Sequence, residues 1–190
     1  MYQDARLPWP DMDDYKNDFE KEFFMVVNLV RNNPQQIMRN VKNFAAQGNN
    51  GPHIHPQACR VVESKLRELD TLPPVSLDGQ ASNSCYVNLT KNENDDGDQI
   101  AGGAVTEYKK QITRSSASDF ELGDNLKKGW RGSPLELLLN ILFTFYSNPS
   151  NQEYTHSLIS PQLKAIGCAL ISSKRHGQLF QVLYLKERKD

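Results

Sequence analysis

The chain has 190 residues, of which 38% are hydrophobic, and its 22 Lys and Arg nearly balance its 23 Asp and Glu, for a formal net charge of -1. This length fits one globular domain with a substantial core, and the balanced charge provides no positive field to attract nucleic acid. We therefore expect no nucleic-acid partner. No apolar run is long enough for a transmembrane segment, and the acidic N-terminus has neither the positive nor the apolar region of a secretory signal.

Residues 1–17 are predicted to form an extended N-terminal arm, because LPWPD contains two prolines that disfavour helix and the run after it is acidic. The arm carries Trp9 together with Asp11, Asp13 and Asp14. A tryptophan with no helix to pack on either folds back on its own domain or inserts into a partner. We expect these four residues to bind a partner protein, with the acidic residues facing a basic surface.

Residues 18–190 are expected to form one folded domain that begins with helices. Apolar residues recur at helical spacing from Phe19 to Val30, and this helix is predicted to end near Asn33 because Pro34 follows. Three more helices are predicted in the same way, one after Pro34, one across residues 58–69 and one across residues 77–91.

The last part of the chain combines a helix with a β-hairpin. SPLE at residues 133–136 is a capping box with proline at the first helical position, so a helix begins there. KAIGCALI and LFQVLYL are β-rich runs around the glycine-containing SSKRHGQ, a pattern typical of a hairpin, and residues 104–114 are a candidate for an earlier strand. Helices followed by a terminal hairpin predict the α+β class, with helices packed on an antiparallel sheet.

Three cysteines bear on the compartment. Cys59, Cys85 and Cys168 are odd in number, lie far apart and form no CxxC pair, so we expect free thiols in a reducing, intracellular compartment. Cys85 and Cys168 fall on apolar faces of predicted elements and have no evident base. We therefore expect them to be core residues rather than nucleophiles.

Four stretches resemble, in order, motifs of the CAP superfamily, the cysteine-rich secretory, antigen 5 and pathogenesis-related 1 proteins, also called the SCP domain. FFMVVNLVRNNPQQI resembles the N-x-x-R-x-x-P of the family's first helix, and LRELDTLPPVSLDGQASNSC resembles its L...LPPL...L...A stretch. GDNLKKG resembles G-E-N-x-x-x-G, and YTHSLISPQLKAIGCAL resembles H-R-x-x-x-x-x-P-x-x-x-x-I-G. The resemblance covers residues 19–186 and implies an α-β-α sandwich around a small central antiparallel sheet.

In this family two histidines and two acidic residues gather in a cleft, where many members bind a divalent metal such as zinc. The resemblance places His156 at the second histidine and Asp124, followed by Asn125, at the glutamate of G-E-N. The first histidine is missing from NENDDGD, and Thr144 and Phe145 stand where the second acid is expected. Two ligands of four hold zinc poorly. We therefore expect no metal, no other cofactor and no catalytic residue, and interpret His156, Asp124 and Asn125 as a remnant cleft.

The structural role we expect for His156 is that of a partly buried hydrogen-bonding residue, and its replacement by alanine is predicted to leave stability nearly unchanged. Three functions remain open: a metal-dependent enzyme such as a hydrolase, a lipid-, sterol- or metal-binding protein that uses the family cleft, and a non-enzymatic interaction or scaffold protein. We favour the third, in a larger cytoplasmic assembly such as a cytoskeletal or ciliary one. It accounts together for the degenerate metal site, the missing signal and the proline–tryptophan arm.

Overall fold

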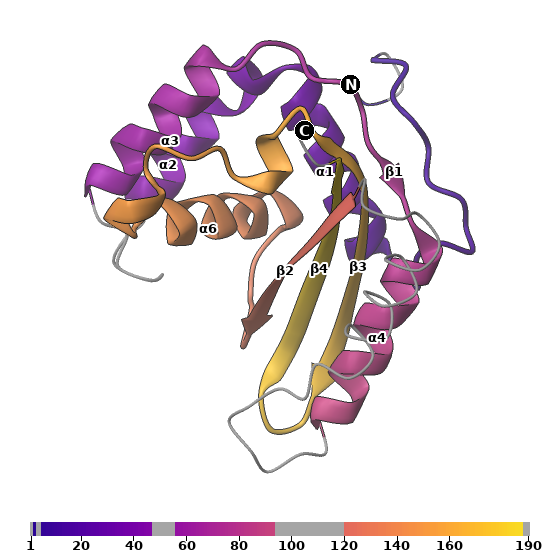
Figure 1. Cartoon of the computed structure of the whole chain (residues 1–190). Helices are drawn as coiled ribbons and strands as arrows, with labels where there is room; N and C mark the ends of the chain where they lie inside the picture. Colours follow the sequence, from indigo (N-terminus) through magenta and orange to yellow (C-terminus); the bar gives the residue numbers. More distant parts are fainter. Residues whose placement is uncertain (1, 3–4, 47–55, 94–119, 188–190) are drawn as a thin grey trace.

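The computed structural model describes residues 2, 5–46, 56–93 and 120–187 of the chain. The predicted α+β class is confirmed: helices lie on both faces of a four-stranded sheet, and the arrangement is an α-β-α sandwich (Figure 1). No helix in these four stretches is long and apolar enough to cross a membrane. The candidate strand at residues 104–114 lies outside them.

The sheet has the strand order β1-β3-β4-β2. β3 (Leu163–Ser173) and β4 (Gly177–Glu187) form the predicted hairpin, and β2 (Phe120–Lys128) pairs with the other side of β4. These pairings are antiparallel, whereas the two-residue β1 (Ser76–Leu77) runs parallel to β3. The sheet is therefore mixed, whereas an antiparallel sheet was expected. The connection from β1 to β3 is long enough to place the two strands in parallel.

α1 (Asp18–Asn32) confirms the first predicted helix. It begins after Asn17, whose side chain accepts a hydrogen bond from the backbone N–H of Glu20. It ends before Pro34, which cannot continue the ladder and instead opens the 3-10 turn η1 (Pro34–Ile37). The other predicted helices are also present, as α2 (Met38–Ala46), α3 (Pro56–Glu68) and α4 (Gly79–Glu93).

α6 (Pro134–Tyr146) begins with the predicted capping box. The Ser133 side chain accepts from the backbone N–H of Glu136, and the Glu136 carboxylate accepts from the backbone N–H of Ser133. After α6, two 3-10 turns lead into the hairpin, η2 (Pro149–Asn151) and η3 (Ser157–Ile159).

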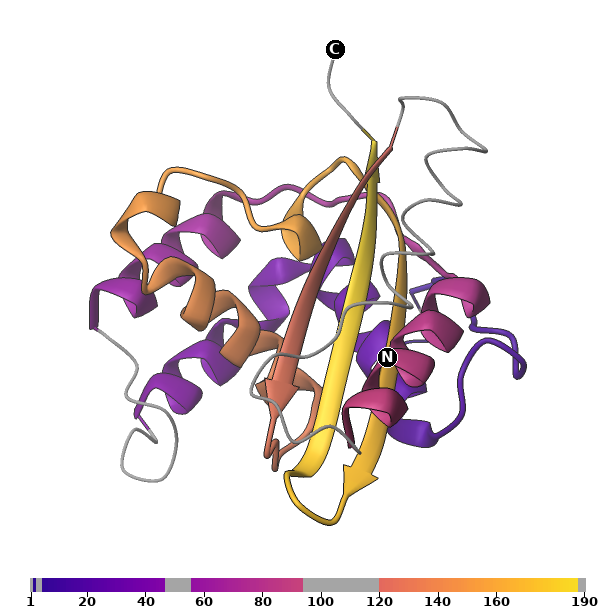
Figure 2. The same cartoon turned by 60° about the horizontal axis from the view of Figure 1, so that its bottom comes forward.

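Two apolar cores lie on opposite faces of the sheet. The larger one is formed with α1, α2, α3 and α6, and the smaller one lies under α4, which packs on the other face (Figure 2). Cys168 belongs to the larger core and Cys85 to the smaller one, so these two buried cysteines lie on opposite faces of the sheet and form no disulfide.

α4 lies unusually close to β3, and Gly167 permits this approach. A Cβ atom at Gly167 would lie 2.3 Å from the Cβ of Ala81 and 2.5 Å from the backbone N of Ser82, distances that real Cβ atoms do not reach. The isoleucine-glycine pair of the quoted motif thus sets the spacing between helix and strand.

The outer edge of β3 continues beyond the short β1, and side chains cover it there. The backbone N–H of Cys168 donates to the Ser82 hydroxyl at 3.2 Å, and the N–H of Leu170 donates to the Glu20 carboxylate at 2.8 Å. The Asn17 amide donates to the carbonyl of Leu170 at 3.3 Å. α4 and the start of α1 therefore satisfy an edge that would otherwise expose unpaired backbone groups.

Candidate functional site

His156, the remnant-cleft residue described with its side chain, is buried and forms the cap of η3. Its Nδ1 accepts a hydrogen bond of 3.1 Å from the backbone N–H of Leu158. Its own backbone N–H donates to the Tyr146 hydroxyl at 3.1 Å. Only 4% of the residue is exposed. One ring nitrogen is thus used as a backbone acceptor, which requires a ring that is not protonated at Nδ1.

Aromatic rings surround the imidazole. Phe145 lies edge-to-face with it at a centroid distance of 4.9 Å, and Tyr184 does so at 5.8 Å. Burial, with a smaller contribution from the positive charge of Lys186, lowers the pKa of His156 to about 4. The imidazole is therefore neutral at physiological pH and held in an apolar setting.

The resemblance expects an acidic residue near the end of α6, where the chain has Thr144 and Phe145. Thr144 is exposed and accepts a hydrogen bond of 3.0 Å from Nζ of Lys127, while Phe145 packs on His156. Among the described side chains, no three His, Cys, Asp or Glu come together as a group that could hold a metal ion.

The other two residues of the predicted remnant cleft lie in β2. The backbones of Asp124 and Asn125 are paired with Leu183 and Val182 of β4. Their side chains lie outside what the structure describes, so the proximity of Asp124 to His156 remains a prediction.

The N-terminal arm exposes two large apolar side chains. Trp9 is 52% exposed and Met12 is 84% exposed. Trp9 contacts Tyr2 edge-to-face at 5.8 Å, and Nζ of Lys21 lies 5.2 Å from its ring centroid. Tyr2 itself is buried and donates to the carbonyl of Pro8 at 2.5 Å. About half of Trp9 is thus covered by its own chain, and the other half is in solvent.

The three acidic residues of the arm differ in surroundings. Asp11 and Asp13 are exposed, whereas Asp14 is partly buried, with an Oδ1 2.5 Å from where a Cβ of Gly79 would lie. The pKa of Asp14 is raised, mainly by burial and further by the negative charges of Asp11, Asp78 and Asp13. Asp14 therefore packs at the start of α4, while Asp11 and Asp13 are exposed to solvent.

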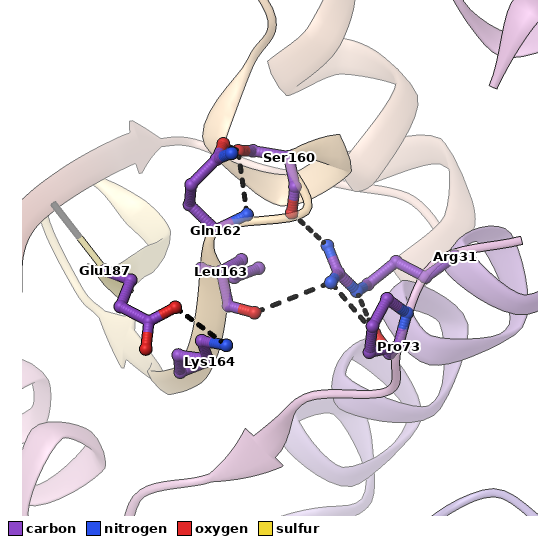
Figure 3. A network of polar contacts seen from close by, with 7 residues as sticks. All are labelled: Arg31, Pro73, Ser160, Gln162, Leu163, Lys164 and Glu187. Carbon is purple, nitrogen blue, oxygen red and sulfur yellow. Dashed lines mark hydrogen bonds and ion pairs between the residues drawn. The ribbon is translucent and has the colours of Figure 1, made fainter. Parts of the chain in front are cut away.

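The role of Arg31 was not predicted from the sequence. Its side chain connects α1 to the loop at Pro73 and to the segment between η3 and β3. Arg31 of α1 is fully buried and donates only to backbone carbonyls, as Figure 3 shows. It donates twice to Pro73, at 3.0 and 2.9 Å, and to Ser160 at 2.9 Å. Weaker bonds reach Leu158 at 3.2 Å and Leu163 at 3.5 Å. Burial lowers the pKa of Arg31 to about 10, so it stays charged.

A second polar residue of α1 acts in the same way. The Asn28 side chain donates to the carbonyl of Val75 at 3.1 Å and accepts from the N–H of Val75 at 2.8 Å. Asn28 and Arg31 are the asparagine and arginine of the N-x-x-R-x-x-P stretch. That motif was the signal in the sequence, and its polar residues bind the backbone of loops.

The sequence matches no protein-family model, and no curated protein matches it either. Solved structures with a similar arrangement include an outer surface protein from Borrelia burgdorferi, with 15% identity, a TM-score of 0.37, and coverage of 84% of this chain and 96% of that one. A cysteine-rich secretory protein from Staphylococcus aureus shows 10% identity, a TM-score of 0.38, and coverage of 81% of this chain and 39% of that one. The Ancylostoma-secreted protein Ac-ASP-7 shows 13% identity, a TM-score of 0.36, and coverage of 92% and 70%.

TM-scores of this size describe only a loosely shared arrangement of elements. They say nothing of what this chain binds or catalyses.

Proposed function

We propose that the chain is a non-enzymatic interaction protein built on a CAP-like α-β-α sandwich, and that the N-terminal arm is its main contact with a partner protein. The observation that carries this proposal is the joint exposure of Trp9 and Met12, at 52% and 84%. Among the described residues only Tyr154 is a further large hydrophobic residue with this degree of exposure. Neighbouring exposed apolar side chains are typical of a surface that a partner covers.

The chemistry of the arm favours a basic partner surface. Asp11 and Asp13 flank Met12 and are exposed, and their charges contribute to the raised pKa of Asp14. Carboxylates that repel one another gain from a nearby cation, and exposed acidic residues steer association mainly by raising its rate. A tryptophan that becomes buried supplies the anchor, which contributes about 2 kcal/mol or more at an interface.

The surroundings of His156 support a role without catalysis. Its Nδ1 already accepts the N–H of Leu158, and Phe145 and Tyr184 pack against its ring. Because the ring is neutral and its Nδ1 accepts a hydrogen bond, the ring hydrogen lies on Nε2, so neither nitrogen offers a free lone pair to a proton or a metal. The contacts of this histidine instead fit a residue that fixes the loop after α6.

We place the protein in a reducing compartment, as part of a cytoplasmic assembly such as a cytoskeletal or ciliary one. Support for the compartment comes from the cysteines, because none of Cys59, Cys85 and Cys168 is joined to another in a disulfide. Such a set suits a compartment that keeps thiols reduced.

The proposal is tested by point variants rather than by deletion, because Asp14 and Asn17 belong to the packing of the folded domain. Trp9→Ser combined with Met12→Ser is compared with Tyr154→Ser, which changes an exposed aromatic residue elsewhere. Quantitative affinity capture from native cells should lose specific proteins with the arm variant and keep them with the Tyr154 variant. Both variants should keep the wild-type melting temperature. A lower melting temperature with unchanged capture would show that Trp9 serves its own domain and would refute the proposal.

A further inference from the structure

The end of the sheet where β3 turns into β4 carries a cluster of positively charged residues. Lys174 and Arg175 lie in that turn, Lys128 is the last residue of β2, and Arg131 follows it. All four are exposed. Together they are called the basic tip.

Backbone contacts hold the two segments of the basic tip side by side. The backbone N–H of Trp130 donates to the carbonyl of Gln178 at 3.1 Å. A Cβ atom at Gly129 would lie 3.6 Å from the carbonyl oxygen of His176. The basic tip is thus one surface, although its residues come from segments more than 40 positions apart in the sequence.

The positive charge of the basic tip is not balanced locally. Residues 125–135 and 171–186 contain no Asp or Glu, and the chain as a whole has a net charge of -1. Within the described part of the chain, Lys128, Arg131 and Lys174 form no ion pair with an acidic residue. Like charges held close together repel one another, and an anionic partner removes that repulsion.

The rest of the surface narrows the kind of anion. The exposed large apolar residues of the described chain are Trp9, Met12 and Tyr154, so the basic tip has none that would insert into a bilayer. Nucleic acid is a long polyanion, and the 23 acidic residues of the chain would repel its flanking phosphates. A short acidic segment of a protein fits the basic tip better than either.

The N-terminal arm of the chain is itself a short acidic segment. Asp11, Met12 and Asp13 are consecutive and exposed, and Trp9 lies two residues before them. The basic tip also includes a site for apolar contact, because Trp130 is partly exposed between Lys128 and Arg131 in the sequence. The two surfaces are therefore complementary in charge and in apolar contact.

Within one chain the arm and the basic tip lie apart (Figure 1). The carboxylate of Asp14 lies beside Gly79 at the start of α4, and the backbone N–H of Asp78 donates to the carbonyl of Ile166 at 2.8 Å. The β3–β4 turn begins after Ser173, which lies about 23 Å further along β3 at the usual rise of a strand. Contact between the two surfaces therefore requires two copies of the chain.

We propose that the acidic arm of one copy docks on the basic tip of a second copy, so that copies of the chain join head to tail. This inference rests on the proposed role of the arm and names its partner. The arm and the basic tip are different surfaces, so the contact is heterologous and builds either open chains or closed rings of copies.

The test uses two variants that each neutralise one side of the contact. The arm variant is Asp11→Asn with Asp13→Asn, and the tip variant is Lys128→Gln with Lys174→Gln. In sedimentation velocity the wild type should associate as its concentration rises, and salt should weaken this association by screening the charges. Each variant alone should associate about ten-fold more weakly or less and keep the wild-type melting temperature.

An equimolar mixture of the two variants identifies the contacting pair. The intact arm of the tip variant fits the intact tip of the arm variant, while the other two surfaces are neutralised. The mixture should therefore form a 1:1 dimer that does not grow further. Arg39→Gln with Lys42→Gln, which removes two exposed cations from α2, is the control and should associate as the wild type does.

The outcomes separate this inference from the proposed function. A wild type that stays monomeric, with capture of other proteins still dependent on the arm, would overturn the head-to-tail contact and leave the arm as a partner-binding surface. Association that persists in the arm variant would overturn both. A monomeric wild type whose basic tip binds DNA or anionic vesicles, or whose melting temperature falls in the tip variant, would assign the basic tip to another anion.

Discussion

The carboxylate of Glu20 accepts a hydrogen bond of 2.8 Å from the backbone N–H of Leu170, which lies 150 residues later in the sequence. The same carboxylate accepts from the backbone N–H of Lys16 at 2.7 Å and from the side chain of Asn17 at 2.9 Å. A single buried acid thus fixes the start of α1, the end of the arm and the edge of β3.

Glu20→Ala should lower the free energy of unfolding by about 2 kcal/mol or more, because it leaves the Leu170 N–H buried without its acceptor. Glu20→Gln keeps an oxygen that can accept one bond and should cost less. Glu22→Ala, at an exposed position of the same helix, is the control and should change little. Chemical denaturation measures all three, and equal stabilities for Glu20→Ala and Glu22→Ala would contradict this account.

Arg31→Lys should be strongly destabilising even though the charge is kept. A lysine ammonium cannot reproduce the planar fork that donates to Pro73, Ser160 and Leu163 together. We expect a loss of about 3 kcal/mol, since buried carbonyls lose their donors. Arg39→Lys, on the exposed face of α2, should be neutral in the same denaturation experiment. Similar curves for the two variants would show that the Arg31 fork does not hold these loops.

Gly167→Ala should destabilise the chain by about 3 kcal/mol, because the new methyl group has no space against α4. Adding Ala81→Gly removes the closest atom but leaves backbone of Ala81 and Ser82 at 2.5 Å from the new Cβ. The double variant should therefore recover little stability. Full recovery in thermal melts would mean that only the side chain of Ala81 sets the spacing.

Stability should fall in mild acid because His156 must remain neutral when folded. Its pKa is about 4 in the folded chain and about 6.5 when solvated, so the unfolded state binds more protons between these values. The contribution of about 3 kcal/mol is complete above pH 6.5 and is lost as the pH falls toward 4. Denaturation of His156→Gln at several pH values should show a shallower slope in this window than the wild type. Parallel slopes would contradict the assignment.

The burial of His156 also changes an expectation drawn from the sequence. As a remnant ligand it was predicted to be replaceable by alanine with little effect on stability. Its cap on Leu158 and its contacts with Phe145 and Tyr184 now favour a measurable loss, since a cavity and an unpaired backbone N–H would remain.

The sequence predicted the elements that carry strong local signals. The capping box before α6, the stop at Pro34 and the hairpin around SSKRHGQ are all read from residues close together in the chain. β2 was not predicted, because FELGDNLKK has too few apolar residues to alternate clearly and is paired by β4, about sixty residues later.

The polar residues inside the fold were less predictable. From the sequence, Glu20 in the first turn of a helix is expected to be a solvated acid and Arg31 a surface cation. Their burial could not be predicted, because their partners are backbone groups 42 and 150 residues away. The resemblance did select Asn28 and Arg31 as motif residues but not their role. In the predicted cleft, the sequence selected His156 but not its aromatic surroundings, because these depend on tertiary packing.

Site-specific photo-cross-linking in native cells tests most directly whether the N-terminal arm binds a partner protein. A photoreactive phenylalanine analogue replaces Met12 in one chain and Tyr154 in another, since both positions are exposed. We predict a discrete cross-linked protein partner from position 12 that is absent from position 154 and is reduced by Trp9→Ser. No discrete product from position 12, or the same products from both positions, would contradict the claim.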